Sequence, residues 1–189
     1  RISHHIDIAT FAKKIGNLKR VKRAGWVRIG VKNPESVADH IFRLSIISLV
    51  IAEELGVDRS KLVELALVHD LAESLVGDIV AERGKKDQKA KVDKSYKEEE
   101  AMKILFNNAM ISKRYLDLWW EYETQNSPEA KILKQLDKFE MVMQALEYEQ
   151  EKAAKPSDFD EFWENAKLHI KESKLVKILG DLEKKRKND

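Results

Sequence analysis

Residues 62–70 read LVELALVHD, an apolar run that ends in the adjacent polar residues His69 and Asp70. The apolar residues recur at the three- and four-residue spacing of one helix face, and His69 falls on that face. Burying an imidazole or a carboxylate without a partner costs on the order of several kcal/mol. The stretch therefore predicts a helix that packs into a core and carries two groups in need of polar partners or a metal ion.

The remainder of the chain also shows the apolar spacing of helices. Only seven glycines and three prolines occur among 189 residues, and no alternating run of β-branched residues indicates a strand. Ser36 and Gly56 suit the start and end of one helix, and Asp58 suits the start of the next. The sequence thus predicts an all-α fold. The expected helices cover 2–21, 37–55, 59–73, 95–109, 112–125, 127–153 and, as one or two helices, 159–187, with loops at 25–34 and 74–94.

Length and composition bound the class of protein. A chain of 189 residues is long enough for one sizeable core and short for two, so we expect a single domain over 1–189. Its core should span about 18–153, with a C-terminal helical extension at 157–187. Cysteine is absent, which excludes disulfides and thiolate catalysis and fits a cytoplasmic location. No apolar stretch reaches the ~20 residues that cross a membrane, so no membrane partner is expected.

Charged residues are abundant but nearly balanced. The chain has 35 basic and 33 acidic residues and a net charge of +2, so its composition does not favour a nucleic-acid partner. Their distribution is uneven, with eight basic and no acidic residues within 13–32 and five lysines within 85–94. Two interpretations stay open, namely solvated faces or regions that attract an anionic substrate.

Two further polar residues interrupt apolar helix faces far from the first pair. His40 lies in an otherwise apolar helix, and Asp137 lies between Leu136 and Phe139. Imidazole nitrogens and carboxylate oxygens together suit a divalent transition metal. If the helices cross, these residues form one metal site of a hydrolase; taken singly, each also fits a core residue that is satisfied by hydrogen bonds. The predicted ligands are His40, His69, Asp70 and Asp137.

Four longer strings make the pattern specific: NPESVADH (33–40), HDLAE (69–73), VGD (76–78) and LDKFE (136–140). In this order they resemble the HD-domain phosphohydrolases, an all-α superfamily, and within it the branch of the 5'-deoxynucleotidases and oxetanocin-like relatives. The similarity extends over about 18–148. It implies one HD domain that hydrolyses deoxynucleoside 5'-monophosphates to deoxynucleoside and phosphate, commonly as a homodimer. It also implies one divalent transition metal, such as cobalt or manganese, held by His40, His69, Asp70 and Asp137.

The resemblance also implies roles for two acidic residues beside the metal. Glu73, one helical turn after His69, matches an essential glutamate that orients or deprotonates the attacking water. Asp78 matches a second active-site residue, which contacts the sugar 3'-hydroxyl. Without the resemblance, Glu73 reads as a surface residue that ends a helix, and Asp78 reads as an aspartate in a turn.

An arginine on the 5'-phosphate and a tryptophan near the sugar C2' position complete the implied substrate site. Trp26 fits the second role by its place upstream of the first histidine, although it fits a core aromatic equally well. A guanidinium matches phosphate oxygens in pairs, which favours Arg23 for the first role. The two residues are adjacent in the bacterial enzymes and are separated by two residues here, so Lys22 and Arg28 compete with Arg23.

Other functions fit the same motifs. The fold could serve a phosphodiesterase or a nucleoside tri- or polyphosphate hydrolase, which would change the substrate and keep the metal site. A helical module that binds a nucleotide without turning it over belongs to a different class. The complete set of predicted ligands together with Glu73 favours an enzyme.

Overall fold

The computed structural model describes residues 6–79, 88–107 and 110–188, and within them it confirms the all-α prediction. The only extended pairing among these residues is an isolated bridge between Lys22 and Ser36. In chain order the elements are α1 (Ile8–Ile15), the 3₁₀ helix η1 (Gly16–Lys19), α2 (Ala24–Arg28), α3 (Val37–Ile51), α4 (Arg59–Val68), α5 (Glu73–Val76), α6 (Gln88–Phe106), α7 (Met110–Thr124), α8 (Pro128–Gln150), α9 (Pro156–His169) and α10 (Ser173–Asn188).

Several boundaries differ from the predicted ones, mostly near the polar motifs. The helix expected over 59–73 stops at Val68 and resumes at Glu73 as the one-turn α5. The loop expected over 25–34 contains the short helix α2, and α6 already begins at Gln88 within the loop expected over 74–94. In the first predicted helix, α1 begins only after Asp7, whose carboxylate accepts hydrogen bonds from two backbone N–H groups.

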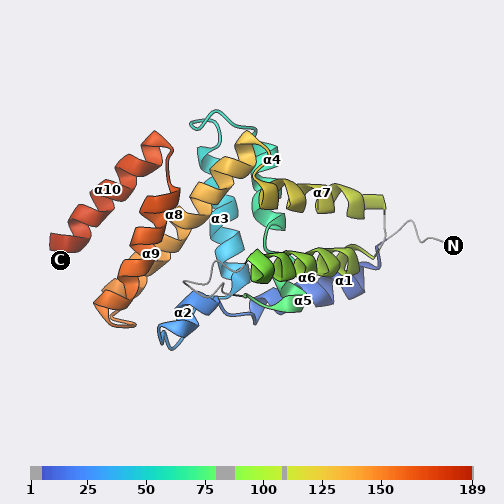
Figure 1. The fold of residues 1–189 in the computed structure, drawn as a ribbon, viewed down its shortest axis with the longest axis horizontal. Coiled ribbons are helices and arrows are strands. Elements are labelled where there is room, and N and C mark those ends of the chain that lie inside the picture. Colours follow the sequence, from blue (N-terminus) through green and yellow to red (C-terminus); the bar gives the residue numbers. More distant parts are fainter. Residues whose placement is uncertain (1–5, 80–87, 108–109, 189) are drawn as a thin grey trace.

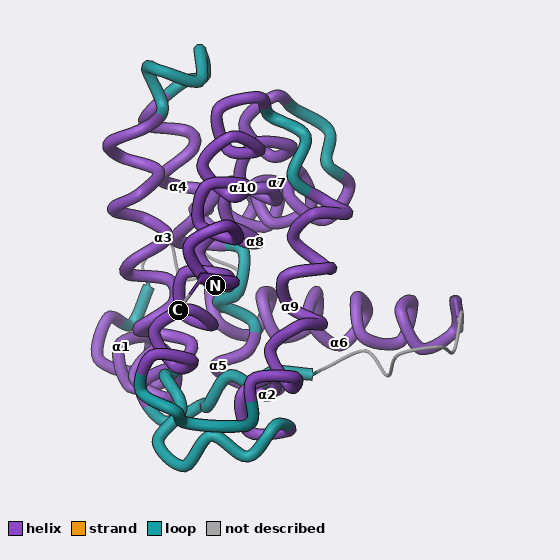
Figure 2. The backbone as a smooth tube through the Cα atoms, turned by 90° about the vertical axis from the view of Figure 1, so that its left-hand side faces the viewer, coloured by secondary structure: helices purple, strands orange, loops and turns teal. Residues whose placement is uncertain are grey.

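The main core lies where α3, α4, α8 and α9 pack together, and α8 crosses α3 and α4 near the middle of the molecule (Figure 1). A 90° turn shows α3 and α4 side by side (Figure 2). Leu44, Leu62 and Leu133 from these helices are fully buried in this core. A second cluster joins the end of α4 to α6 and α7 through Val68, Met102 and similar side chains. The polar motifs at the end of α4 therefore lie between two apolar clusters.

The C-terminal helices pack on α8 opposite α6 and α7 (Figure 1). Phe159 and Trp163 of α9 are fully buried in the main core. Near the end of α10, Arg186 donates to Glu149 of α8 at 2.7 Å and to Asp160 of α9 at 2.6 Å. This arginine fastens the last helix to the two before it.

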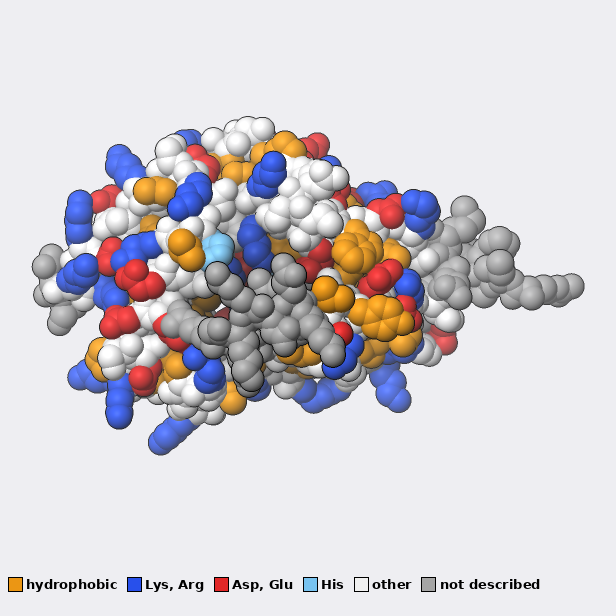
Figure 3. Space-filling view, viewed as in Figure 1, with side chains coloured by type: hydrophobic (Ala, Val, Ile, Leu, Met, Phe, Trp, Pro, Cys, Tyr) orange, Lys and Arg blue, Asp and Glu red, His pale blue; other side chains and the backbone are white. Residues whose placement is uncertain are grey.

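The surface view shows basic and acidic side chains interspersed, with no large area of one sign on the visible face (Figure 3). Among the helices that the structure describes, none combines the length and the hydropathy needed to cross a membrane.

Candidate metal centre and active site

The helix α3 places His40 in the interior. Its first turn is closed by a reciprocal cap, in which the Asp39 carboxylate accepts from the Ser36 N–H at 2.7 Å and the Ser36 hydroxyl accepts from the Asp39 N–H at 3.2 Å. Val37 and Leu44 pack inward on either side, and the His40 side chain is 0% exposed. The cap thus fixes where α3 begins, and the apolar residues fix which face of it is buried.

The helix α4 ends at the second histidine. His69 is its C-terminal cap, and the His69 Nδ1 lies 2.8 Å from the Ala66 carbonyl oxygen, to which it donates. The other ring nitrogen, Nε2, is therefore the one left to accept a proton or a metal. The chain turns after His69 before α5 begins at Glu73. Consecutive residues of a continuous helix point about 100° apart, and this turn allows Asp70 to reach the same point as His69.

The third element is α8, which carries Asp137. Leu133 and Leu136 of the same helix are fully buried, and Asp137 is only 6% exposed. The next residue, Lys138, places its Nζ 3.1 Å from an Asp137 oxygen. Although burial opposes ionisation, Lys138 and His40 hold the pKa of Asp137 well below its usual range.

The four predicted metal ligands converge. The His69 Nε2 lies 3.1 Å from an oxygen of Asp70, and the same oxygen lies 3.8 Å from the His40 Nε2. The His40 Nε2 lies 3.3 Å from an oxygen of Asp137. Single ligand atoms of His40, His69 and Asp137 all fall within 4.8 Å of one another. The sequence motifs, which are up to a hundred residues apart, therefore meet at one point.

The buried nitrogens of this cluster fit a metal ion. Neither the His40 Nε2 nor the His69 Nε2 has a hydrogen-bond partner among the residues that the structure describes. Such buried polar atoms are rare unless an ion or water satisfies them. Burial lowers the pKa of His40, but its contacts with Asp137 and Glu140 outweigh that effect and raise it to about 9. Two imidazole nitrogens facing two carboxylates are a donor set that suits Mn²⁺, Co²⁺ or Zn²⁺.

Arg23 is the basic residue of the 13–32 segment that reaches this cluster. It precedes α2, and its guanidinium lies 3.6 Å from Asp70 and 4.0 Å from Asp137. Its predicted competitors lie elsewhere, since Lys22 is exposed and Arg28 pairs with Glu161 on α9. The structure thus brings Arg23 together with the predicted ligands and leaves the other two outside.

The two acidic candidates also lie beside the cluster. Glu73 is 3% exposed, and its Oε2 has no hydrogen-bond partner within the described part of the chain. Burial, together with the charges of Asp70 and Asp78, raises the pKa of Glu73 far above its usual value. Asp78 accepts a hydrogen bond from the Ala24 N–H at 2.7 Å, which ties its turn to the loop that carries Arg23.

Trp26 lies in the core next to this loop. Its indole is 2% exposed and packs against Phe162 and Tyr148, with ring centroids 4.4 and 5.4 Å away. The indole N–H donates to Glu35 at 2.9 Å. These contacts match the core interpretation of Trp26, and a contact with the sugar stays a prediction.

Sequence reasoning assigned no role to two further polar residues, the fully buried Glu140 and the half-buried Arg43. Glu140 lies 2.5 Å from the His40 Nδ1, and Arg43 donates to the same Glu140 carboxylate at 2.8 Å. The signal was present in the sequence: Glu140 follows Asp137 by one turn of α8, and Arg43 follows His40 by one turn of α3. Their pairing was hidden because it depends on how the two helices cross.

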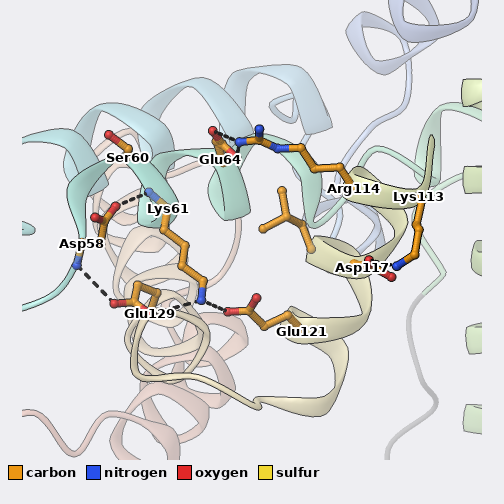
Figure 4. A pocket seen from close by; sticks show the side chains of 10 residues that line it. Asp58, Ser60, Lys61, Glu64, Lys113, Arg114, Asp117, Glu121 and Glu129 are labelled. Atoms are coloured by element: carbon orange, nitrogen blue, oxygen red, sulfur yellow. Dashed lines mark hydrogen bonds and ion pairs between the residues drawn. The ribbon is translucent and has the colours of Figure 1, made fainter. Parts of the chain in front are cut away.

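A surface pocket of about 830 Å³ opens between α4 and α7 (Figure 4), and none of the site residues described above lines it. Its charged side chains pair among themselves: Lys61 reaches Glu121 at 2.8 Å, and Arg114 reaches Glu64 at 2.7 Å. Because these charges satisfy one another, the pocket offers little to a charged substrate. The metal ligands and Arg23 remain the candidate active site.

Comparisons with known proteins identify the family of this chain. A model of the HD domain matches residues 15–178. The 5'-deoxynucleotidase HDDC2 of zebrafish (Danio rerio) is 41% identical over 182 residues, which cover 95% of this chain and 88% of that one. The human (Homo sapiens) 5'-deoxynucleotidase HDDC2 is 40% identical over 182 residues, covering 95% and 86%. A solved structure of a conserved hypothetical protein from Pyrococcus furiosus matches with a TM-score of 0.74 and 32% identity, covering 93% of this chain and 99% of that one.

Proposed function

Because this chain belongs to the HD domain family, we propose that its buried His-Asp cluster is the centre of a metal-dependent 5'-deoxynucleotidase. The reaction hydrolyses a deoxynucleoside 5'-monophosphate: a water oxygen bonds to phosphorus, the P–O5' bond breaks, and the deoxynucleoside leaves with a proton. The observation that carries the proposal is the pair of buried histidine nitrogens that form no hydrogen bond within the described residues and lie 3.1 and 3.3 Å from carboxylate oxygens of Asp70 and Asp137. Relatives named 5'-deoxynucleotidase that share about 40% of their residues with nearly the whole chain support the substrate class.

We propose that one divalent metal ion, cobalt, manganese or a similar ion, is the cofactor. His40, His69, Asp70 and Asp137 would hold it. When bound, such an ion lowers the pKa of a water molecule toward neutrality and polarises a phosphoryl oxygen. The chain's own residues then have to place the phosphate, move the proton and select the sugar.

Arg23 is the proposed phosphate-binding residue. Its guanidinium is 16% exposed and lies between Asp70 and Asp137, so it can reach an anion held at the cluster. A planar guanidinium binds two phosphate oxygens at once and neutralises the charge that develops on them. Its fixed positive charge also limits the repulsion between the phosphate and the carboxylates.

Glu73 and Asp78 are the proposed catalytic residues beside Arg23. Burial, with the nearby charges of Asp70 and Asp78, raises the pKa of Glu73 and so makes its carboxylate a stronger base, which suits it to take up and hold the proton of the attacking water. Asp78 accepts from the Ala24 N–H with one oxygen. Its carboxylate can also accept a hydrogen bond from the sugar 3'-hydroxyl.

The preference for deoxyribose is assigned to Trp26. It lies three residues after Arg23, and its indole is held in place by aromatic packing and by the hydrogen bond to Glu35. A fixed ring beside the phosphate-binding loop would crowd a 2'-hydroxyl.

A panel of substrates tests the proposed activity. The protein, loaded with Mn²⁺ or Co²⁺, should release phosphate from deoxynucleoside monophosphates faster than from the matching ribonucleotides. Hydrolysis of deoxynucleoside triphosphates, cyclic nucleotides or guanosine tetraphosphate in their place would favour the phosphodiesterase or polyphosphate hydrolase alternative. Metal binding without any turnover would favour a nucleotide-binding module, and equal rates on ribonucleotides would contradict the deoxyribose preference.

We also propose that the protein acts in the cytoplasm as a homodimer. An apolar stripe on the outer face of α3 supports the dimer: Phe42, Ile46, Leu49 and Val50 are between 45% and 72% exposed. Light scattering should give twice the chain mass for the wild type and for Leu168→Asp, an exposed apolar residue of α9, but one chain mass for Phe42→Asp. A wild-type monomer, or a dimer that Phe42→Asp leaves intact, would contradict this interface.

A further inference from the structure

We propose that Glu140, held by Arg43, is a positioning residue that fixes the ring of His40 for metal binding. The inference rests on the proposed metal site and adds to it a residue that touches neither metal nor substrate. Glu140 contacts the His40 Nδ1, the ring nitrogen on the side that faces away from the cluster.

The contact between His40 and Glu140 is short and enclosed. The His40 Nδ1 lies 2.5 Å from the Glu140 Oε2, and both side chains are 0% exposed. A hydrogen bond from Nδ1–H to a carboxylate fixes which nitrogen carries the proton, and it makes the opposite nitrogen a better donor to a metal. That opposite nitrogen is the Nε2 that lies 3.3 Å from Asp137. Asp137 and Glu140 lie one turn apart on α8, so this one helix contacts both sides of the His40 ring.

Arg43 holds the Glu140 carboxylate from the other side. The Arg43 Nε donates to the Glu140 Oε1 at 2.8 Å, and its two terminal nitrogens donate to Glu147 and Gln144, each at 2.8 Å. The three acceptors lie along one face of α8, and Arg43 lies one turn after His40 on α3. The arginine therefore joins the two helices and places a positive charge 2.8 Å from a fully buried carboxylate.

A second cation site is the alternative explanation of this cluster. Ligand atoms of Glu35, His40 and Glu140 lie within 4.8 Å of one another. In the structure, however, the Glu140 oxygens are already used by the His40 Nδ1 and by Arg43, and Glu35 accepts from the Trp26 indole. The existing hydrogen bonds leave Glu140 with a positioning role.

The two histidines differ in how they are held, which makes the inference testable. The His69 Nδ1 donates to a backbone carbonyl, whereas the His40 Nδ1 depends on a side chain. Glu140→Gln keeps the size and an acceptor but removes the charge. Glu147→Gln is the matched control, because Glu147 also binds Arg43 but does not contact His40.

The experiment titrates metal-free wild type, Glu140→Gln and Glu147→Gln with Co²⁺, and follows heat and the visible absorption of the bound ion. We expect Glu140→Gln to bind Co²⁺ ~10- to 100-fold more weakly, with a shifted absorption spectrum. We expect Glu147→Gln to keep the affinity and spectrum of the wild type. Neither readout requires substrate or turnover.

Each outcome distinguishes the inference from the proposed metal site. If the wild type binds no Co²⁺, the metal site itself is wrong. If the wild type binds and Glu140→Gln matches it, or if both variants lose affinity equally, the positioning role is overturned. If Glu140→Gln does not fold, imidazole nitrogen shifts of wild type loaded with diamagnetic Zn²⁺ decide the question: a protonated Nδ1 and a metal-bound Nε2 on His40 are expected, and the reverse overturns it.

Discussion

The two halves of the proposed metal centre are built in different ways. On one side, His40 and Asp137 come from the two long helices α3 and α8, and a partly buried network through Glu140 and Arg43 joins these helices. On the other side, His69 and Asp70 lie in the turn between α4 and α5, where a backbone carbonyl orients the histidine. The helix pair supplies a rigid wall, and the turn brings several functional groups to one point. We expect both halves to supply metal ligands, the helix pair to hold its two ligands rigidly, and the turn to lead into the residue that carries the chemistry, Glu73.

Replacing His69 tests the turn and should have the largest effect. His69→Ala removes one predicted metal ligand and also the imidazole that lies beside the Asp70 carboxylate. Metal binding and phosphate release should therefore both fall to background. The control is His169→Ala on α9, which removes an exposed histidine. Phosphate release and bound metal, measured on the same samples, check the prediction. Activity retained in His69→Ala would show that the histidine is a structural residue.

Replacing Glu73 separates chemistry from binding. Glu73→Gln should lower kcat about 10²- to 10⁴-fold because the proton acceptor is lost, while Co²⁺ affinity stays within a few-fold of the wild type. Glu64→Gln, a half-buried residue of α4 that pairs with Arg114, is the control. A large loss of metal affinity in Glu73→Gln would instead show that Glu73 is a metal ligand, which would contradict its assignment to proton transfer alone.

Replacing Arg23 tests the guanidinium that lies near both halves of the site, beside Asp70 and Asp137. A hydrogen bond to a charged group contributes about 1.5–3 kcal/mol, so Arg23→Ala should lower kcat/KM on the order of 10- to 100-fold. The loss should appear chiefly in KM if Arg23 binds the ground-state phosphate. Arg28→Ala, which removes the surface pair with Glu161, should leave the kinetics unchanged. Equal losses in the two variants would count against a specific phosphate contact.

Replacing Trp26 should give the smallest effect, and it tests the aromatic core of α2 that packs beside the helix pair. Trp26→Phe keeps an aromatic ring in the core but leaves Glu35 without its indole donor, which should lower the free energy of unfolding by about 1–3 kcal/mol. If Trp26 crowds the 2'-hydroxyl, the ratio of kcat/KM for deoxyribo- over ribonucleotides should also fall. Urea unfolding and the paired substrates measure the two effects. Reduced stability with an unchanged ratio would assign Trp26 to the core alone.

The sequence predicted the wall better than the turn. The apolar periods of α3 and α8 correctly placed His40 and Asp137 on buried faces, because a helix fixes the direction of each side chain. A continuous helix over 59–73 was wrong, since no glycine or proline marks the stop after Val68 and the turn forms through tertiary packing. Propensity is a weak guide at such a position.

The sequence also identified the polar residues of the site better than it identified which side chains they contact. The motif that contains Glu140 was visible, but its contact with His40 depends on the crossing of α3 and α8 over a hundred residues of separation. The sequence favoured Arg23 but left Lys22 and Arg28 open, because all three lie in one basic segment, and only the coordinates show that Arg23 lies beside Asp70 and Asp137. Long-range pairing is information that local patterns do not contain.

The most direct test is to titrate metal-free protein with Mn²⁺ or Co²⁺ while measuring phosphate release from a deoxynucleoside monophosphate. The proposed function predicts no activity in the metal-free protein, and a rise that reaches its plateau as about one ion binds per chain. Full activity after complete removal of metal, or no phosphate release at any metal concentration, would contradict it.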